Sequence, residues 1–120
     1  MKFAHIKKNG LLVISLEDER LDTKNTPKFK EEVMPVIDKS GTHDVVFDLN
    51  KLKFIDSSGI GAFLSVLRHL NARGGDLKLA SINPNIQTVL ELISIHKIFH
   101  IFKTTDEAIN ACKHDLSAPN

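Results

Sequence analysis

The sequence predicts a single α/β domain in which a mixed β-sheet carries α-helices mainly on one face. Short apolar runs rich in β-branched residues alternate along the chain with segments whose apolar residues recur at helical spacing. The first two runs are joined only by a tight turn, which favours an antiparallel pair. Helices separate the later runs, which is typical of parallel strands. A length of 120 residues suits one domain.

The chain is predicted to open with a β-hairpin. Residues 2–8 and 11–17 form two strands around Asn9-Gly10, the dipeptide that most strongly indicates a two-residue hairpin turn. Residues 17–26 are polar without periodicity, so they are predicted as a loop.

The first helix is predicted to begin at Thr26, with this residue as N-cap and Pro27 in the first helical position. Its apolar stripe consists of Phe29, Val33, Val36 and Ile37. Pro35 predicts a bend or an early end, because proline cannot donate a helical hydrogen bond. Ser40-Gly41 closes the helix.

The rest of the chain continues the alternation. The predicted strands are 45–49, 77–81 and 100–103. The predicted helices are 59–73, a segment that begins at Pro84, and 105–112. In the helix that begins at Pro84, the residues expected to face inward are Ile86, Val89, Leu90 and Ile93. Residues 1–116 are expected to form the domain and residues 117–120 a frayed tail. Phe54, Phe99 and Phe102 fit no predicted face, and core packing is the favoured interpretation for them.

Charge and cysteine content exclude several classes of protein. The chain has 16 Lys and Arg against 15 Asp and Glu, a formal net charge of +1, and no basic run longer than Lys7-Lys8. It therefore lacks the broad positive surface of a nucleic-acid binder. The single cysteine, Cys112, cannot form an internal disulfide, and no segment has the roughly 20 apolar residues of a membrane span. The chain is predicted to be cytoplasmic, without membrane attachment.

The most informative segment runs from Phe54 to Ala62, between the central strand and its helix. Several motifs fail there: Leu64 stands where a dinucleotide fingerprint needs a small residue, no Gly-Lys-Ser/Thr follows, and Asp56 and Ile60 stand where a nucleophile elbow around Ser58 needs glycine. The remaining interpretations are a helix cap, formed by Ser57 or Ser58, and a phosphoacceptor.

A phosphoacceptor interpretation fits Ser58 because it would lie at the positive end of a helix. The free N–H groups and the dipole of that end favour an anion. A phosphate there adds about −1.5 to −2 charges without unfolding the domain. In a fitted interface it would cost about 2–5 kcal/mol of binding free energy, which is enough for a switch.

Two stretches, Val45 to Leu49 and Phe54 to Gly61, resemble the signature of bacterial anti-sigma factor antagonists of the STAS domain family. The order of the elements and Leu21-Asp22 ahead of the first helix agree with that resemblance. It implies that Ser58, the second serine of Asp-Ser-Ser-Gly, is phosphorylated by a serine kinase that is also the anti-sigma factor. The unphosphorylated chain would bind this kinase and free the sigma factor, and a PP2C-type phosphatase would reset it.

The resemblance assigns further residues to the site. Asp22 would help to bind the kinase, and Asp56 would orient the loop by accepting backbone N–H groups; the alternative for both is a turn-forming aspartate. Ser57 is expected to be a neighbour that caps the helix, and Gly59 and Gly61 to keep the loop open. The family often has glycine ahead of Leu-Asp, whereas this chain has Glu19-Arg20, which puts partner choice in question.

No catalytic residue, cofactor or metal is predicted, and the free chain is expected to be a monomer. His96 and His100 have helical spacing but no third ligand, so they are interpreted as surface or half-buried histidines. Two alternatives remain open: a STAS subunit of a stressosome-like or lipid-transport complex, and a small enzyme or nucleotide-binding protein.

Overall fold

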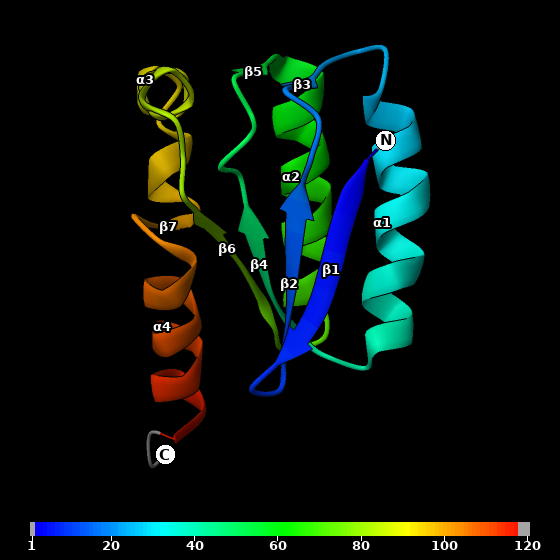
Figure 1. Ribbon diagram of the computed structural model, residues 1–120, viewed down its shortest axis with the longest axis vertical. Helices are drawn as coiled ribbons and strands as arrows, with labels where there is room; N and C mark the ends of the chain where they lie inside the picture. Colours follow the sequence, from blue (N-terminus) through cyan, green and yellow to red (C-terminus); the bar gives the residue numbers. More distant parts are fainter. Residues whose placement is uncertain (1, 118–120) are drawn as a thin grey trace.

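A computed structural model describes residues 2–117, with side chains through residue 112. Its main sheet has five strands in the order β1-β2-β4-β6-β7 (Figure 1). These strands are β1 (Phe3–Lys8), β2 (Leu11–Leu16), β4 (Asp44–Asp48), β6 (Asp76–Ala80) and β7 (His100–Phe102). β1 pairs antiparallel with β2, and the remaining neighbours pair parallel. The predicted mixed α/β sheet is confirmed.

The hairpin turn forms as the sequence predicts. Asn9 and Gly10 have φ angles of 55° and 81°, and left-handed backbone at both turn positions is what a type I′ turn requires. Phe3 pairs with Leu16 and Lys8 with Leu11, so the six residues of each strand align without a bulge.

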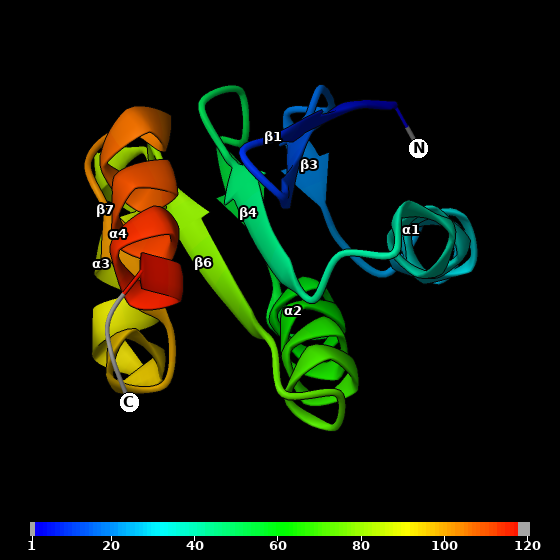
Figure 2. The same ribbon diagram turned by 90° about the horizontal axis from the view of Figure 1, so that it is seen from below.

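Four helices cover the sheet unequally. They are α1 (Thr26–Ser40), α2 (Ser57–Asn71), α3 (Pro84–Leu92) and α4 (Thr105–Ser117). Residues of α1, α2 and α3 share one large hydrophobic core with the strands, whereas α4 packs on a smaller cluster around Leu11, Val46 and Ile109. Figure 2 shows α1 and α2 side by side. Most helical packing is therefore on one face, as predicted.

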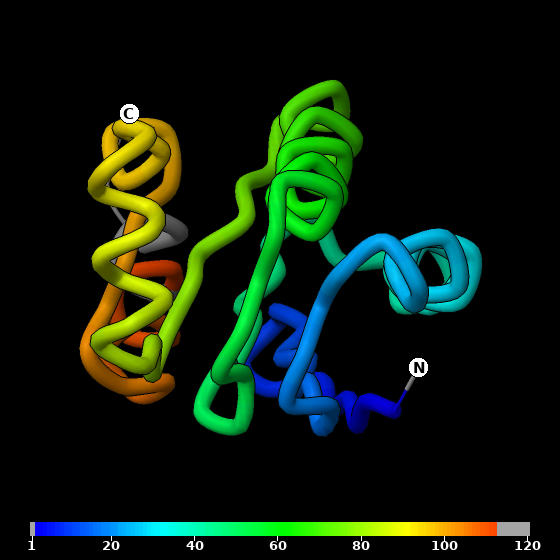
Figure 3. The backbone as a smooth tube through the Cα atoms, turned by 90° about the horizontal axis from the view of Figure 1, so that it is seen from above, coloured from blue at the N-terminus to red at the C-terminus, as the bar shows by residue number. Residues whose placement is uncertain are grey.

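Two very short strands pair apart from the main sheet. β3 (Arg20–Leu21) and β5 (Phe54–Ile55) run parallel, with Arg20 opposite Phe54. Seen from above, β3 leads into the start of α1 and β5 into the start of α2 (Figure 3). The prediction of an unbroken loop over residues 17–26 was wrong, because two residues are too few to show a period.

The first helix differs from its prediction at two places. Asn25, not Thr26, is the N-cap residue, and Thr26 is the buried first residue of α1. Pro35 does not end the helix, which continues to Ser40. Pro35 lies on the exposed side, so the buried side chains of Val33 and Ile37 on either side keep the helix against the core.

Two predictions of burial were wrong. Ile93 follows the last residue of α3 and is 50% exposed, because the helix ends before it can turn inward. Phe54 is 41% exposed, whereas Phe99 is buried and Phe102 half-buried. Ser117 is the last residue of α4, and the rest of the predicted tail lies outside the described residues. No helix among the described residues is both long and apolar enough to cross a membrane.

Candidate functional site

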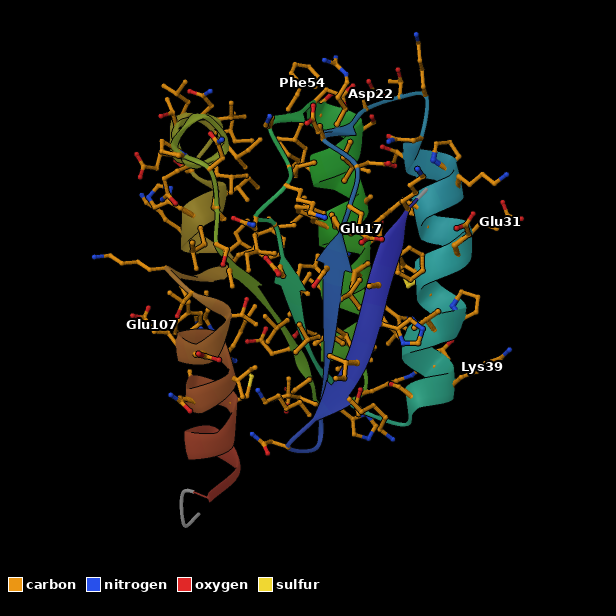
Figure 4. The ribbon with its side chains drawn as sticks, viewed as in Figure 1. Glu17, Asp22, Glu31, Lys39, Phe54 and Glu107 are labelled. Carbon is orange, nitrogen blue, oxygen red and sulfur yellow. The ribbon has the colours of Figure 1, made fainter. Side chains whose placement is uncertain are left out.

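The site lies where β3 and β5 lead into α1 and α2. Backbone N–H groups of Lys53 and Phe54 donate to the carbonyl of Glu19, and that of Asp56 donates to Leu21 at 3.2 Å. These bonds hold the loop before α1 against the loop before α2. Asp22 and Asp56 therefore follow two adjacent strands, at the end of the molecule where Figure 4 labels Asp22 and Phe54.

Asp56 is the N-cap of α2 and connects the two loops. One of its oxygens, Oδ1, accepts hydrogen bonds from the backbone N–H groups of Ser58 at 3.0 Å and Gly59 at 3.1 Å. Its other oxygen, Oδ2, accepts from the backbone N–H of Thr23 at 3.1 Å. Asp56 therefore has two roles: it satisfies free N–H groups at the start of α2, and it holds the loop before α1 in place.

The Ser58 hydroxyl is half-buried in this arrangement. Its Oγ donates to Asp56 Oδ1 at 2.5 Å and lies 3.5 Å from the hydroxyl oxygen of Thr26. Thr26 donates to the carbonyl of Asp22 at 2.6 Å. Ser58 is therefore held in place from both loops. A group transferred to its Oγ would stand at the N-terminus of a 15-residue helix.

The electrostatics of the site favour an ionised Asp56. The hydrogen bond from the Ser58 hydroxyl is the largest cause that lowers the pKa of the Asp56 carboxyl. Desolvation by burial, the next largest, raises it, and the backbone N–H groups of Gly59, Thr23 and Ser58 lower it further, so the pKa lies below its ordinary value. A second charge on Ser58 would thus stand directly beside a carboxylate.

Asp22 shapes the loop before α1. Its Oδ1 accepts from the backbone N–H of Lys24 at 3.0 Å, and its own N–H donates to the side chain of Asn25 at 2.9 Å. Its Oδ2 forms an ion pair with Arg20 Nε at 3.3 Å. These are the bonds of a turn-forming aspartate, and they leave the side chain half-buried, close to Thr26 and Ser58.

Gly59 and Gly61 were predicted to keep a loop open, but both lie inside α2. Gly59 is buried inside α2, and a Cβ there would come within 2.7 Å of the Leu21 carbonyl oxygen. Its role is close packing of α2 against β3, not an open loop. A Cβ at Gly61 would meet nothing within 4 Å. Ser57 is the exposed first residue of α2, and the capping predicted for a serine belongs to Asp56.

Sequence reasoning missed a pair of residues beside the site. The Arg20 guanidinium stacks on the Phe54 ring, with its central carbon 4.2 Å from the ring centroid. Neither residue has a periodic signal, because the strands that bring them together have two residues each.

Two hollows among the described residues lie away from the site. One, of about 330 Å³, lies beside Ile82 and Phe102, and the other, of about 270 Å³, beside His5 and Val36. None of the predicted site residues lines either hollow. No group of three metal-ligating side chains occurs among the described residues, and His96 lies in a short 3₁₀ turn (Ile95–Lys97), apart from His100 in β7. The arrangement suits contact with another protein.

Comparison with known proteins finds sequence relatives that are named anti-sigma factor antagonists. The chain is 28% identical over 102 residues to the anti-sigma F factor antagonist of Paenibacillus polymyxa, covering 85% of this chain and 84% of that protein. It is 26% identical over 105 residues to the anti-sigma-B factor antagonist of Staphylococcus aureus, covering 88% of each.

Solved structures show the same fold. An anti-sigma factor antagonist from Mycobacterium paratuberculosis superposes with a TM-score of 0.80 at 20% identity, over 92% of each chain. The phosphorylated form of the Bacillus cell fate determinant SpoIIAA gives a TM-score of 0.69 at 24% identity, over 92% of this chain and 99% of that one. The STAS domain model matches residues 3–108. The chain belongs to the STAS domain family.

Proposed function

We propose that this protein is an anti-sigma factor antagonist controlled by phosphorylation of Ser58. Unphosphorylated, it binds an anti-sigma factor that is also a serine kinase, and this releases the sigma factor. The kinase phosphorylates Ser58 and thereby ends the complex, and a PP2C-type phosphatase restores the free hydroxyl. The protein acts as a single-domain cytoplasmic binding module, without catalysis of its own.

The observation that carries this proposal is the position of the Ser58 hydroxyl. It lies at the N-terminus of α2, in a surface shared by two loops, with its proton donated to Asp56. Support also comes from relatives named anti-sigma factor antagonists, which this chain matches over most of their length.

The geometry explains why a phosphate would act on binding. A phosphoserine carries about −1.5 to −2 charges. On Ser58 it would stand beside the ionised Asp56 and near Asp22, which adds negative charge to a surface that already presents two carboxylates. A partner surface fitted to the bare hydroxyl would lose about 2–5 kcal/mol of binding free energy, which corresponds to roughly a 30-fold to several-thousand-fold weaker complex.

A labelling experiment tests the assignment. Extract of the organism's own cells with radiolabelled ATP should transfer phosphate to the purified wild-type chain and to Ser57→Ala, but not to Ser58→Ala. Ser57 is the matched control because it is the neighbouring hydroxyl and is exposed. Equal labelling of Ser58→Ala and wild type would refute the proposal.

A second candidate, a STAS subunit of a larger assembly, predicts a different result. Such a subunit would purify from its own cells in a stable complex regardless of the state of Ser58. The antagonist should instead exchange between free and kinase-bound forms as Ser58 is modified.

A further inference from the structure

Arg20 and Phe54 form a stacked pair beside Asp22 and the hydrogen bonds that hold Ser58. They stand opposite each other in the β3–β5 register, and the guanidinium lies over the ring at 4.2 Å from its centroid. Arg20 Nε also donates to Asp22 Oδ2 at 3.3 Å. The side chain of Arg20 nevertheless remains 61% exposed, and Phe54 is 41% exposed. We call these two residues the Arg20–Phe54 platform.

In the Arg20–Phe54 platform, the terminal NH₂ groups of Arg20 and part of the Phe54 ring remain available for binding. Arginine presents five N–H donors in a planar fork, and Asp22 uses only Nε. No other described residue bonds the two terminal NH₂ groups of Arg20. Stacking and the ion pair hold the guanidinium in one orientation, so it can receive a bidentate carboxylate with little further loss of side-chain freedom. The exposed part of the Phe54 ring offers an apolar contact beside it.

The platform is continuous with the proposed kinase-binding site. Arg20 bonds the Asp22 side chain, the Asp22 carbonyl bonds Thr26, and the Thr26 hydroxyl oxygen is 3.5 Å from that of Ser58. A protein that reaches Ser58 would therefore also cover Arg20 and Phe54. Arginine and aromatic residues are enriched at the core of protein interfaces, and arginine is among the residues that dominate binding energy there.

We infer that the Arg20–Phe54 platform selects the kinase partner. The partner surface that fits it places a carboxylate on the Arg20 fork next to an apolar side chain on Phe54. This inference rests on the proposed function and adds to it the residues that decide which anti-sigma factor binds.

The test is the ratio of phosphorylated to unphosphorylated Ser58 in the organism's own cells, measured by mass spectrometry after chromosomal replacement. Arg20→Ala and Phe54→Ala should each lower this ratio about tenfold, as expected for residues that dominate an interface. Arg20→Lys should also lower it, because lysine keeps the charge but lacks the fork.

Lys53→Ala is the matched control. Lys53 is 64% exposed and forms an ion pair with Glu19 at 3.3 Å, which closely matches the exposure and ion-pair distance of Arg20. Its ratio should stay within twofold of wild type, and thermal unfolding should show that all variants remain folded.

The outcomes separate the two claims. A phosphorylated fraction that is unchanged or raised in Arg20→Ala and Phe54→Ala would overturn the inference and leave the proposed function standing. An equal drop in Lys53→Ala would also overturn it, since any lost cation would then suffice. A wild-type Ser58 that never carries phosphate would refute the proposed function itself, and this inference with it.

Discussion

At the scale of single residues, the Ser58 hydroxyl and the Asp56 carboxylate form one unit. The carboxylate accepts the hydroxyl proton at 2.5 Å and also caps α2. The serine that we propose as phosphoacceptor is therefore also a main reason why the pKa of Asp56 is low. Phosphorylation of Ser58 would remove this donor and place further negative charge beside the Asp56 carboxylate.

Substitution of Ser58 should be visible in the titration of Asp56. Ser58→Ala removes the largest cause of the lowered pKa, so the Asp56 pKa should rise toward its ordinary value, as measured by NMR titration of the carboxyl carbon. Because the folded-state pKa is depressed, the linked stability is present above the unfolded-state pKa and is lost as pH falls through the folded-state pKa. Because Ser58→Ala brings the two pKa values closer together, it should narrow the pH range over which protonation of Asp56 lowers the free energy of unfolding. An unchanged Asp56 pKa would contradict the hydrogen bond.

Individual site residues were predicted with mixed success. The position of Ser58 at a helix N-terminus follows from the sequence, because turn residues precede a clear apolar stripe. The cap was assigned to a serine, whereas Asp56 holds it, since serine and aspartate are almost equally good caps. Arg20 and Phe54 could not be paired, because their contact joins segments more than 30 residues apart without any periodic pattern.

At the scale of elements, the site depends on how closely α2 approaches β3. Gly59 permits this approach, since the Leu21 carbonyl oxygen occupies the place of a side chain. The sequence indicates small residues at this helix start but not what they contact. The contact is with backbone, which cannot give way as a flexible side chain would.

Two glycine substitutions test this packing. Gly59→Ala should lower the free energy of unfolding by about 1–3 kcal/mol, the usual cost of overpacking, because the new methyl group meets Leu21 and Ile55. Gly61→Ala, in the same helix with open space around it, should be neutral or stabilising by up to about 1 kcal/mol. Denaturant unfolding measures both, and equal effects of the two substitutions would contradict the close approach.

The C-terminal ends of α1 and α2, away from the site, are joined by a polar contact that was not predicted from the sequence. Asp38 near the end of α1 bonds both Arg73 and His69, and these bonds, that of Arg73 first, lower the Asp38 pKa. Asp38→Asn should lower stability by less than about 1 kcal/mol, as is usual for exposed ion pairs, and salt should reduce the effect. Thermal unfolding at two salt concentrations checks this. A much larger and salt-independent loss would show that the contact is not mainly electrostatic.

At the scale of the whole molecule, the fold was predictable and the small β3–β5 pair was not. The strand and helix periods, the Asn9-Gly10 turn and the Pro84 start all appear in the structure, because each rests on a local pattern several residues long. The β3–β5 pair depends on tertiary contacts between two loops. It is also the part of the fold that brings Asp22, Asp56 and Ser58 together.

Modification should change this end of the molecule and leave the rest unchanged. Phosphate on Ser58 should shift backbone amide NMR signals mainly in residues 20–26 and 54–62, while α4 and the hairpin turn keep theirs. The helix N-terminus accommodates an anion, so the main sheet has no reason to rearrange. Signal changes spread across β6, β7 and α4 would instead indicate a global conformational switch.

The most direct test of the account is the intact mass of the chain isolated from its own cells under several growth conditions. The account predicts two species that differ by one phosphate, in proportions that change with conditions, and peptide sequencing that places the phosphate on Ser58. A single unmodified mass under every condition, or a phosphate on any other residue, would contradict it.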